Sequence, residues 1–122
     1  MIDIILVEDS VAVRNRLRLL LAEIPQFRVM GEYDSADAAI AAIASQPPDV
    51  LLLDIKLRVG NGIDVLRYVT SHAQPVQVIV FSQHDDAEYR EQFQQAGARF
   101  FFNKTHETAN LRNTLQRTAA QS

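Results

Sequence analysis

Five polar residues directly follow short apolar runs that have the length of β-strands. Glu8 and Asp9 follow the first run, Asp54 the third, Ser82 the fourth and Lys104 the fifth. If these runs are parallel strands, their carboxyl ends lie at one edge of a sheet, which is where such sheets bind ligands. We therefore expect three carboxylates, one hydroxyl and one ammonium to converge at that edge.

This combination of groups has a chemistry that the separate residues do not have. Clustered carboxylates repel one another unless a cation or protons compensate, and a set of oxygen ligands suits a hard ion such as Mg²⁺. A carboxylate is also a possible nucleophile that forms an acyl phosphate, and phosphoryl transfer needs mainly charge neutralisation and positioning. A single strand-terminal Asp or Ser is usually a turn former, so the prediction depends on all five occurring together.

The elements that position these residues can be predicted from the alternation of apolar runs with helical patterns, which is typical of α/β proteins. Nearly continuous apolar strands suit a parallel sheet that is covered on both faces. We expect one doubly wound (βα)5 domain over residues 1–122. Its predicted strands are Ile4–Val7, Arg28–Tyr33, Val50–Leu53, Val76–Phe81 and Arg99–Phe102.

Each strand is followed by a segment in which apolar residues recur at helical spacing. Ser10 is a good N-cap for the first helix, Pro25 ends it, and Gly97 lies where a C′ glycine is expected after the fourth. The predicted helices run from about Ser10 to Ile24, Ser35 to Ser45, Ile63 to Ser71, after Asp86 to Ala96, and onward from Thr105 or His106.

Composition excludes several classes of protein. The chain has 122 residues, 48% of them hydrophobic, which suits a single domain with a real core. A net charge of −3 gives no reason to expect nucleic-acid binding. The absence of cysteine excludes disulfides and thiol chemistry. The N-terminal residues have no basic region followed by a long apolar stretch, and no apolar run approaches the length of a membrane span, so we expect a soluble, cytoplasmic protein without a signal peptide or membrane contact.

From Ile4 to Gln116 the sequence closely resembles the receiver domains of bacterial two-component response regulators. The resemblance rests on Ile5–Ser10, on Asp49–Leu57 with Gly62 downstream, on Val78–Ser82 and on Ala96–Lys104. As a set, these segments are highly specific for that family. The resemblance implies a flavodoxin-like fold with parallel sheet order 2-1-3-4-5.

The resemblance also assigns roles to the residues at the strand ends. It implies that Asp54 is the phosphoacceptor, and that Ser82 and Lys104 grip the phosphoryl group. Mg²⁺, or another divalent cation such as Mn²⁺, would be held by Glu8, Asp9 and Asp54 with the backbone carbonyl of Lys56. Phe101 occupies the position of an aromatic switch residue that swings inward as Ser82 moves.

Further expectations concern partners and output. The resemblance implies phosphoryl transfer from a sensor histidine kinase or a phosphotransfer protein, followed by remodelling of the face formed by the fourth helix, fifth strand and fifth helix. That face would alter contacts with a downstream protein or form a homodimer. The chain is either a stand-alone regulator or the receiver portion of a longer one. We expect a phosphoacceptor switch that assists its own phosphorylation and dephosphorylation, not an enzyme acting on a separate substrate.

The sequence departs from the family pattern at several positions. Arg58 replaces the usual proline, which we expect to alter loop stiffness, and Gln83 replaces a small residue, which would narrow access to Asp54. Thr105 replaces a proline whose peptide bond is often cis in the family. Lys56 and His84 each lie two residues beyond a site residue, at positions that overlook the phosphoryl group in receivers, and we expect them to set its lifetime. The Lys56 side chain would either pair with a phosphoryl oxygen or extend into solvent.

Three other functions fit the sequence less well. A flavin- or nucleotide-binding protein of similar fold needs a phosphate-cradling loop after its first strand, whereas Glu8 and Asp9 would repel a phosphate there. Metal-dependent phosphatases and topoisomerase-primase domains pair the strand-end Asp with a second Asp two residues on, where this chain has Lys56. A degenerate receiver that only binds partners would lack part of the acidic set, which is complete here.

Overall fold

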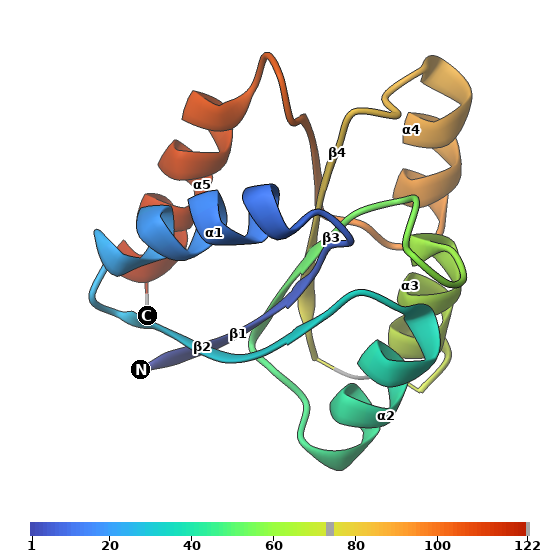
Figure 1. Cartoon of the computed structure of the whole chain (residues 1–122), viewed down its shortest axis with the longest axis horizontal. Helices are drawn as coiled ribbons and strands as arrows, with labels where there is room; N and C mark the ends of the chain where they lie inside the picture. Colours follow the sequence, from blue (N-terminus) through green and yellow to red (C-terminus); the bar gives the residue numbers. More distant parts are fainter. Residues whose placement is uncertain (73–74, 122) are drawn as a thin grey trace.

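A computed structural model of the chain, which describes residues 1–72 and 75–121, shows a parallel five-stranded sheet of order β2-β1-β3-β4-β5. This confirms the predicted α/β fold and strand order. Helices α1 and α5 cover one face of the sheet, and α2, α3 and α4 cover the other (Figure 1). The elements are β1 (Ile2–Val7), α1 (Val11–Ala22), β2 (Phe27–Tyr33), α2 (Ala36–Ser45), β3 (Val50–Leu53), α3 (Gly62–Ser71), β4 (Gln77–Ser82), α4 (Ala87–Gln95), β5 (Phe100–Asn103) and α5 (Thr108–Ala120).

Two hydrophobic cores lie on opposite faces of the sheet. Along β1, Ile5 and Val7 pack into the core beneath α2, α3 and α4, whereas Ile4 and Leu6 pack into the core beneath α1 and α5. This alternation follows from the two-residue period of side chains along a strand. The central strand β3 is buried throughout, as expected for a parallel strand with helices on both sides.

Polar caps fix the start of four helices, and thereby the loops that precede them. The side chains of Ser10, Ser35, Asn61 and Asp86 accept hydrogen bonds from backbone N–H groups in the first turns of α1, α2, α3 and α4. The predicted capping role of Ser10 is confirmed. Gly97 has a φ of 112°, which suits the C′ position that the sequence predicted for it.

Some predicted boundaries were wrong by one or more residues. Strands β4 and β5 each lie one residue later than predicted, because Ser82 pairs with Asn103 at the end of the sheet. Helix α5 begins at Thr108. Thr105 and His106 instead form a turn, in which their N–H groups donate to the side chain of Asn103 at 2.7 and 2.9 Å. A side-chain acceptor competing for backbone donors explains the delayed helix.

Within the described residues, no helix has the length and apolar character needed to cross a membrane.

Glu107 stabilises the junction between β5, α4 and α5. One of its oxygens accepts hydrogen bonds from Asn103 N at 3.0 Å and from Arg90 Nη2 at 2.8 Å. Burial alone would raise the pKa of Glu107, but these bonds outweigh it and hold the pKa below the ordinary value. A lowered carboxyl pKa stabilises the fold above the pKa of the unfolded chain, and that stability is lost as the pH falls through the folded pKa.

We predict that Glu107→Gln lowers the free energy of unfolding by about 1–2 kcal/mol at neutral pH, because charge-assisted hydrogen bonds weaken. The difference from wild type should close in acid, where Glu107 is protonated. Urea denaturation across the acid range measures this. Glu91→Gln, which neutralises an exposed carboxylate on α4, is the control and should show no comparable pH-dependent gap. An equal gap at neutral and acid pH would contradict the prediction.

Candidate functional site

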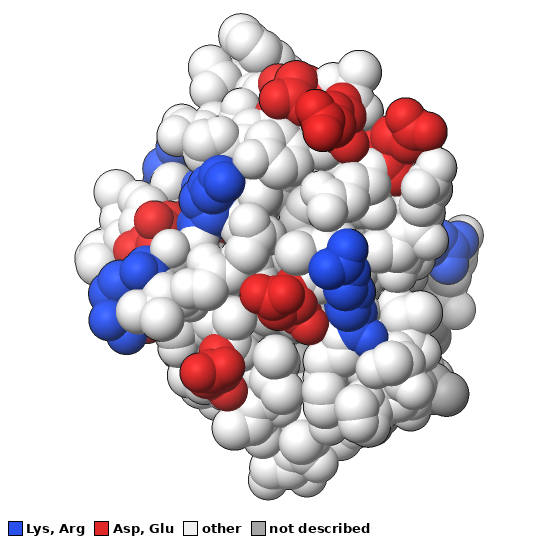
Figure 2. Space-filling view, turned by 90° about the vertical axis from the view of Figure 1, so that its right-hand side faces the viewer, with Lys and Arg blue, Asp and Glu red and all other residues white. Residues whose placement is uncertain are grey.

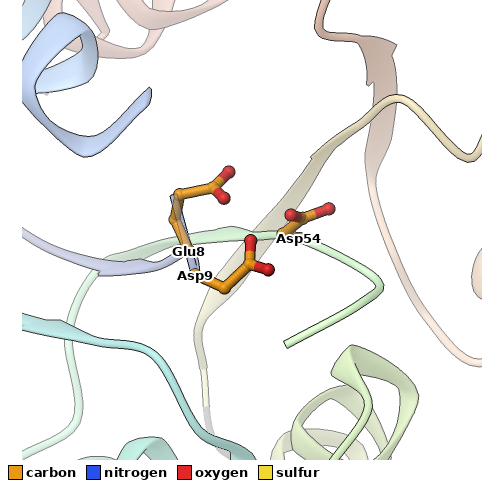
Figure 3. Close-up of side chains that lie close together, drawn as sticks. All are labelled: Glu8, Asp9 and Asp54. Carbon is orange, nitrogen blue, oxygen red and sulfur yellow. The ribbon is translucent and has the colours of Figure 1, made fainter. Parts of the chain in front are cut away.

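The carboxyl ends of β1, β3, β4 and β5 bring the predicted site residues to one edge of the sheet. Glu8 and Asp9 follow β1, Asp54 follows β3, Ser82 ends β4 and Lys104 follows β5. The side chains of Glu8, Asp9 and Asp54 converge (Figure 3), and one carboxylate oxygen from each lies within 4.8 Å of the others. The predicted convergence of the three carboxylates is therefore present in the structure.

The ammonium group of Lys104 lies between two buried carboxylates. Its Nζ is 2.6 Å from Glu8 Oε1 and 2.7 Å from Asp54 Oδ2. Glu8 and Asp54 are only 2% and 4% exposed, so their charges are poorly screened by water. Because Asp9 is exposed, it is the carboxylate of the three that solvent reaches most easily.

Each of the two buried carboxylates also accepts a hydrogen bond from a backbone N–H group. Asp54 Oδ1 accepts a hydrogen bond from Ile55 N at 2.8 Å, and Glu8 Oε2 accepts one from Ser10 N at 3.0 Å. The pKa of Glu8 is nevertheless raised to about 7, first by burial and then by the charge of Asp54. Burial would lower the pKa of Lys104, but its bonds to Asp54 and Glu8 raise it more, so the lysine stays charged.

A cavity of about 300 Å³ opens over this cluster. Ser82 does not line it in this conformation: the residue is fully buried, and its hydroxyl accepts a hydrogen bond from His84 N at 3.2 Å. Gln83 is exposed and forms part of the cavity wall. The lining residues are Asp9, Ser10, Val13, Asp54, Lys56, Gln83, His84 and Lys104.

Lys56 adopts a position that the sequence did not predict. Its ammonium group lies over the ring of Tyr89, 5.4 Å from the ring centre. The ring of His84 contacts the same tyrosine, with centres 6.3 Å apart in an edge-on arrangement. Residue spacing in the sequence gives no sign of these contacts. Tyr89 is therefore a residue near the site that was missed.

Phe101 is buried, with 5% exposure. Its ring packs edge-on against Phe93, with centres 6.1 Å apart, and the guanidinium of Arg90 lies 4.8 Å from its centre. Arg90 Nη1 also donates to the Phe101 carbonyl at 3.1 Å, and Nη2 donates to Glu107. Arg90 thus connects α4 with β5 and the start of α5, a role that the sequence did not reveal.

The loop after β3 is fixed without the usual proline. Arg58 N donates to Asp34 O at 2.9 Å, a bond that proline could not make. The Arg58 guanidinium also makes two hydrogen bonds to the Asp34 carboxylate, at 2.8 and 3.2 Å. In the described part of the chain every peptide bond is trans, which includes Lys104–Thr105.

Gly62 is the first residue of α3, one residue before the predicted start of this helix at Ile63. Its N–H donates to Ile55 O at 2.7 Å. A Cβ added to Gly62 would lie 2.1 Å from the carbonyl oxygen of Asp54, so no side chain fits there without a backbone shift. The glycine therefore allows α3 to start directly against the backbone of Asp54.

The charges on the face that includes α3 and α4 are mixed (Figure 2). Acidic side chains gather at one end of this face, at the top of the view, and further acidic and basic side chains are scattered over the rest of it (Figure 2).

The family model for the response regulator receiver domain matches residues 4–116, most of the chain. The chain belongs to this family. Receiver domains of two-component response regulators act in phosphorylation-based signalling, and this chain is such a domain.

The relatives of this receiver domain include a transcriptional regulatory protein and a methylesterase. The protein is 31% identical over 88 residues to the transcriptional regulatory protein DegU of Brevibacillus brevis, covering 72% of this chain and 37% of the relative. It is 34% identical over 122 residues to protein-glutamate methylesterase/protein-glutamine glutaminase 1 of Pseudomonas savastanoi pv. phaseolicola, covering 98% of this chain and 33% of the relative. The receiver therefore spans well under half the length of these relatives.

Solved receiver structures share the fold over nearly the whole chain. The signal receiver domain of the putative response regulator NarL from Mycobacterium tuberculosis superimposes with a TM-score of 0.87 at 26% identity, covering 99% of this chain and 98% of that chain. The response regulator domain of Thermotoga maritima CheB gives 0.84 at 24% identity, covering 99% and 95%.

We predict that Gly62→Ala lowers the free energy of unfolding of this receiver by about 1–3 kcal/mol, because its methyl group meets the Asp54 carbonyl and the backbone must shift. Urea denaturation measures the change. Gly31→Ala is a matched control, since the three atoms nearest to a Cβ there all belong to the ring end of the Tyr33 side chain and not to backbone. Equal losses in the two variants would show that the close approach to Asp54 carries no special cost.

Proposed function

We propose that this receiver is a phosphorylation switch in which Asp54 accepts a phosphoryl group from a phosphohistidine of a sensor histidine kinase or a phosphotransfer protein. The observation that carries the proposal is the buried contact of Asp54 with Lys104 beneath an open cavity that both residues line. A carboxylate oxygen of Asp54 would form the new bond to phosphorus as the bond to the histidine nitrogen breaks. Lys104 would then neutralise charge on the transferred phosphoryl oxygens.

A divalent cation, Mg²⁺ or Mn²⁺, is part of the proposal. The donor set fits such an ion, because three carboxylates offer oxygens within 4.8 Å of one another and hard cations prefer oxygen ligands. Glu8, Asp9 and Asp54 would hold it, with the backbone carbonyl of Lys56 as a further ligand. When bound, the ion would neutralise charge on the phosphoryl oxygens.

The switch itself would use Ser82 and Phe101. Ser82 lies behind the cavity with its hydroxyl bound to His84 N, and it would move to bind the phosphoryl group. Because Phe101 is buried beside Arg90 and Phe93, movement of β4 would change how α4, β5 and α5 pack. A modification shifts a population only through such differential contacts. The remodelled face would bind a downstream protein or form a homodimer.

The lifetime of the phosphoryl group would be set by Lys56 and His84, which line the cavity from two different loops. Both would hinder the approach of water to the phosphorylated Asp54. We propose that residues 1–122 act as a single receiver domain that works in the cytoplasm, without direct nucleic-acid or membrane contact, alone or as the receiver portion of a longer regulator.

We predict that Asp54 is the only phosphorylation site. Incubation with acetyl phosphate and Mg²⁺ should add the mass of one phosphoryl group to wild type and nothing to Asp54→Asn, as measured by intact-protein mass spectrometry. Asp64→Asn, a neutralisation of an exposed aspartate in the first turn of α3, is the matched control and should behave like wild type. An equal mass gain in Asp54→Asn would refute the assignment.

We predict that Asp9→Asn weakens Mg²⁺ binding by about tenfold or more, because a mostly hydrated ion relies on few anionic ligands. Calorimetric or NMR titration with Mg²⁺ measures the affinity. Asp37→Asn, which neutralises an exposed aspartate in the first turn of α2, should leave the affinity unchanged. The same affinity in wild type and Asp9→Asn would place the ion elsewhere.

A further inference from the structure

Two side chains on the wall of the Asp54 cavity rest on one aromatic ring. The Lys56 ammonium lies 5.4 Å from the ring centre of Tyr89, and the His84 ring meets the same tyrosine edge-on at 6.3 Å. Lys56 comes from the loop after β3, and His84 from the loop after β4. Both line the cavity together with Asp54, whereas Tyr89 lies behind them and outside its lining.

The position of Tyr89 is fixed by the capped first turn of α4. Its backbone N–H donates to Asp86 Oδ1 at 3.0 Å, in the first turn of α4, and its side chain is half-buried. Lys56 is exposed, with a long flexible side chain. Among residues 1–72 and 75–121, no carboxylate lies within ion-pair distance of the Lys56 ammonium, and its charge instead faces the ring of Tyr89.

The physics of this contact restricts the lysine. The face of an aromatic ring carries partial negative charge and attracts a cation within about 6 Å of its centre. The contact keeps the Lys56 side chain folded against α4, where it forms part of the cavity wall, instead of extended into water. Without the ring, the same side chain would gain rotamer freedom and leave the wall for most of the time.

We propose that Tyr89 is a positioning residue for the phosphoryl site. By holding Lys56, and with it His84, it narrows the path by which water would reach phosphorylated Asp54. The effect on phosphoryl lifetime rests on the proposed function, but the contact between Lys56 and Tyr89 does not. The first turn of α4 is thereby connected to the phosphoryl site by a route separate from Ser82 and Phe101.

The contact is tested first in the unphosphorylated protein by NMR. A methylene group next to the ammonium of Lys56 should show a ring-current shift in wild type and in Tyr89→Phe, which keeps the aromatic face. The shift should be lost in Tyr89→Leu and in Tyr89→Met, two non-aromatic variants of which either one suffices if the other does not fold. A Lys56 resonance that is unchanged in the folded non-aromatic variants would overturn the proposal.

The consequence is tested by the decay of phosphorylated Asp54 after removal of acetyl phosphate. Tyr89→Leu should lose its phosphoryl group about threefold faster than wild type, a change that matches an exposed cation–π contact of ~0.65 kcal/mol. Tyr89→Phe should decay like wild type. If Tyr89 acts through Lys56, then adding Lys56→Met to Tyr89→Leu should accelerate decay no further.

The outcomes separate the two proposals. Independent, multiplying effects of Tyr89→Leu and Lys56→Met on the decay rate would overturn the positioning role. Equal decay of wild type and Tyr89→Leu would overturn it as well. A wild-type protein that takes up no phosphoryl group would contradict the proposed function, whereas the NMR shifts of Lys56 would still decide whether Tyr89 holds the lysine.

Discussion

The contact of one ammonium with two buried carboxylates is the constraint on which the site depends. Glu8 and Asp54 lose most of their hydration at the sheet edge, and burying such charges is costly unless they are paired. Lys104 lies between them at hydrogen-bond distance from both. One positive charge does not balance three carboxylates, so the cluster retains an excess of negative charge that is suited to a further cation. The capacity of the site to attract a cation therefore follows from the negative charge that Lys104 leaves uncompensated.

Sheet register decides whether this contact can form. Lys104 reaches Asp54 because β5 pairs with β4 so that Ser82 lies beside Asn103, and the chain then turns back over the sheet edge. A one-residue slip in a strand would send its side chains to the opposite face. The Asn103 side chain and Glu107 hold the turn by accepting backbone N–H groups. A few polar side chains outside the site thus maintain its geometry.

The sequence was sufficient to predict the α/β fold and the residues at the sheet edge, because apolar strand periodicity and strand-end polar residues are local properties of the chain, whereas the strand order was implied by the resemblance to receiver domains. Element boundaries were less accurate: α5 starts later than predicted because Asn103 captures the N–H groups of Thr105 and His106. The contacts of Lys56 with Tyr89 and of Arg90 with Phe101 could not be predicted. Long cationic side chains have many rotamers, and their partners exist only after the helix has packed on the sheet.

The division of the interior by the sheet has a consequence for how such a protein can diverge. Side chains beneath α1 and α5 form one core, and those beneath α2, α3 and α4 form another, with the β-strand backbones between them. Substitutions that share no contacts have nearly additive effects. A volume change at Leu111, for example, requires compensation from its own layer but not from Phe93 on the other side. The two layers can therefore accumulate neutral substitutions as separate evolutionary units.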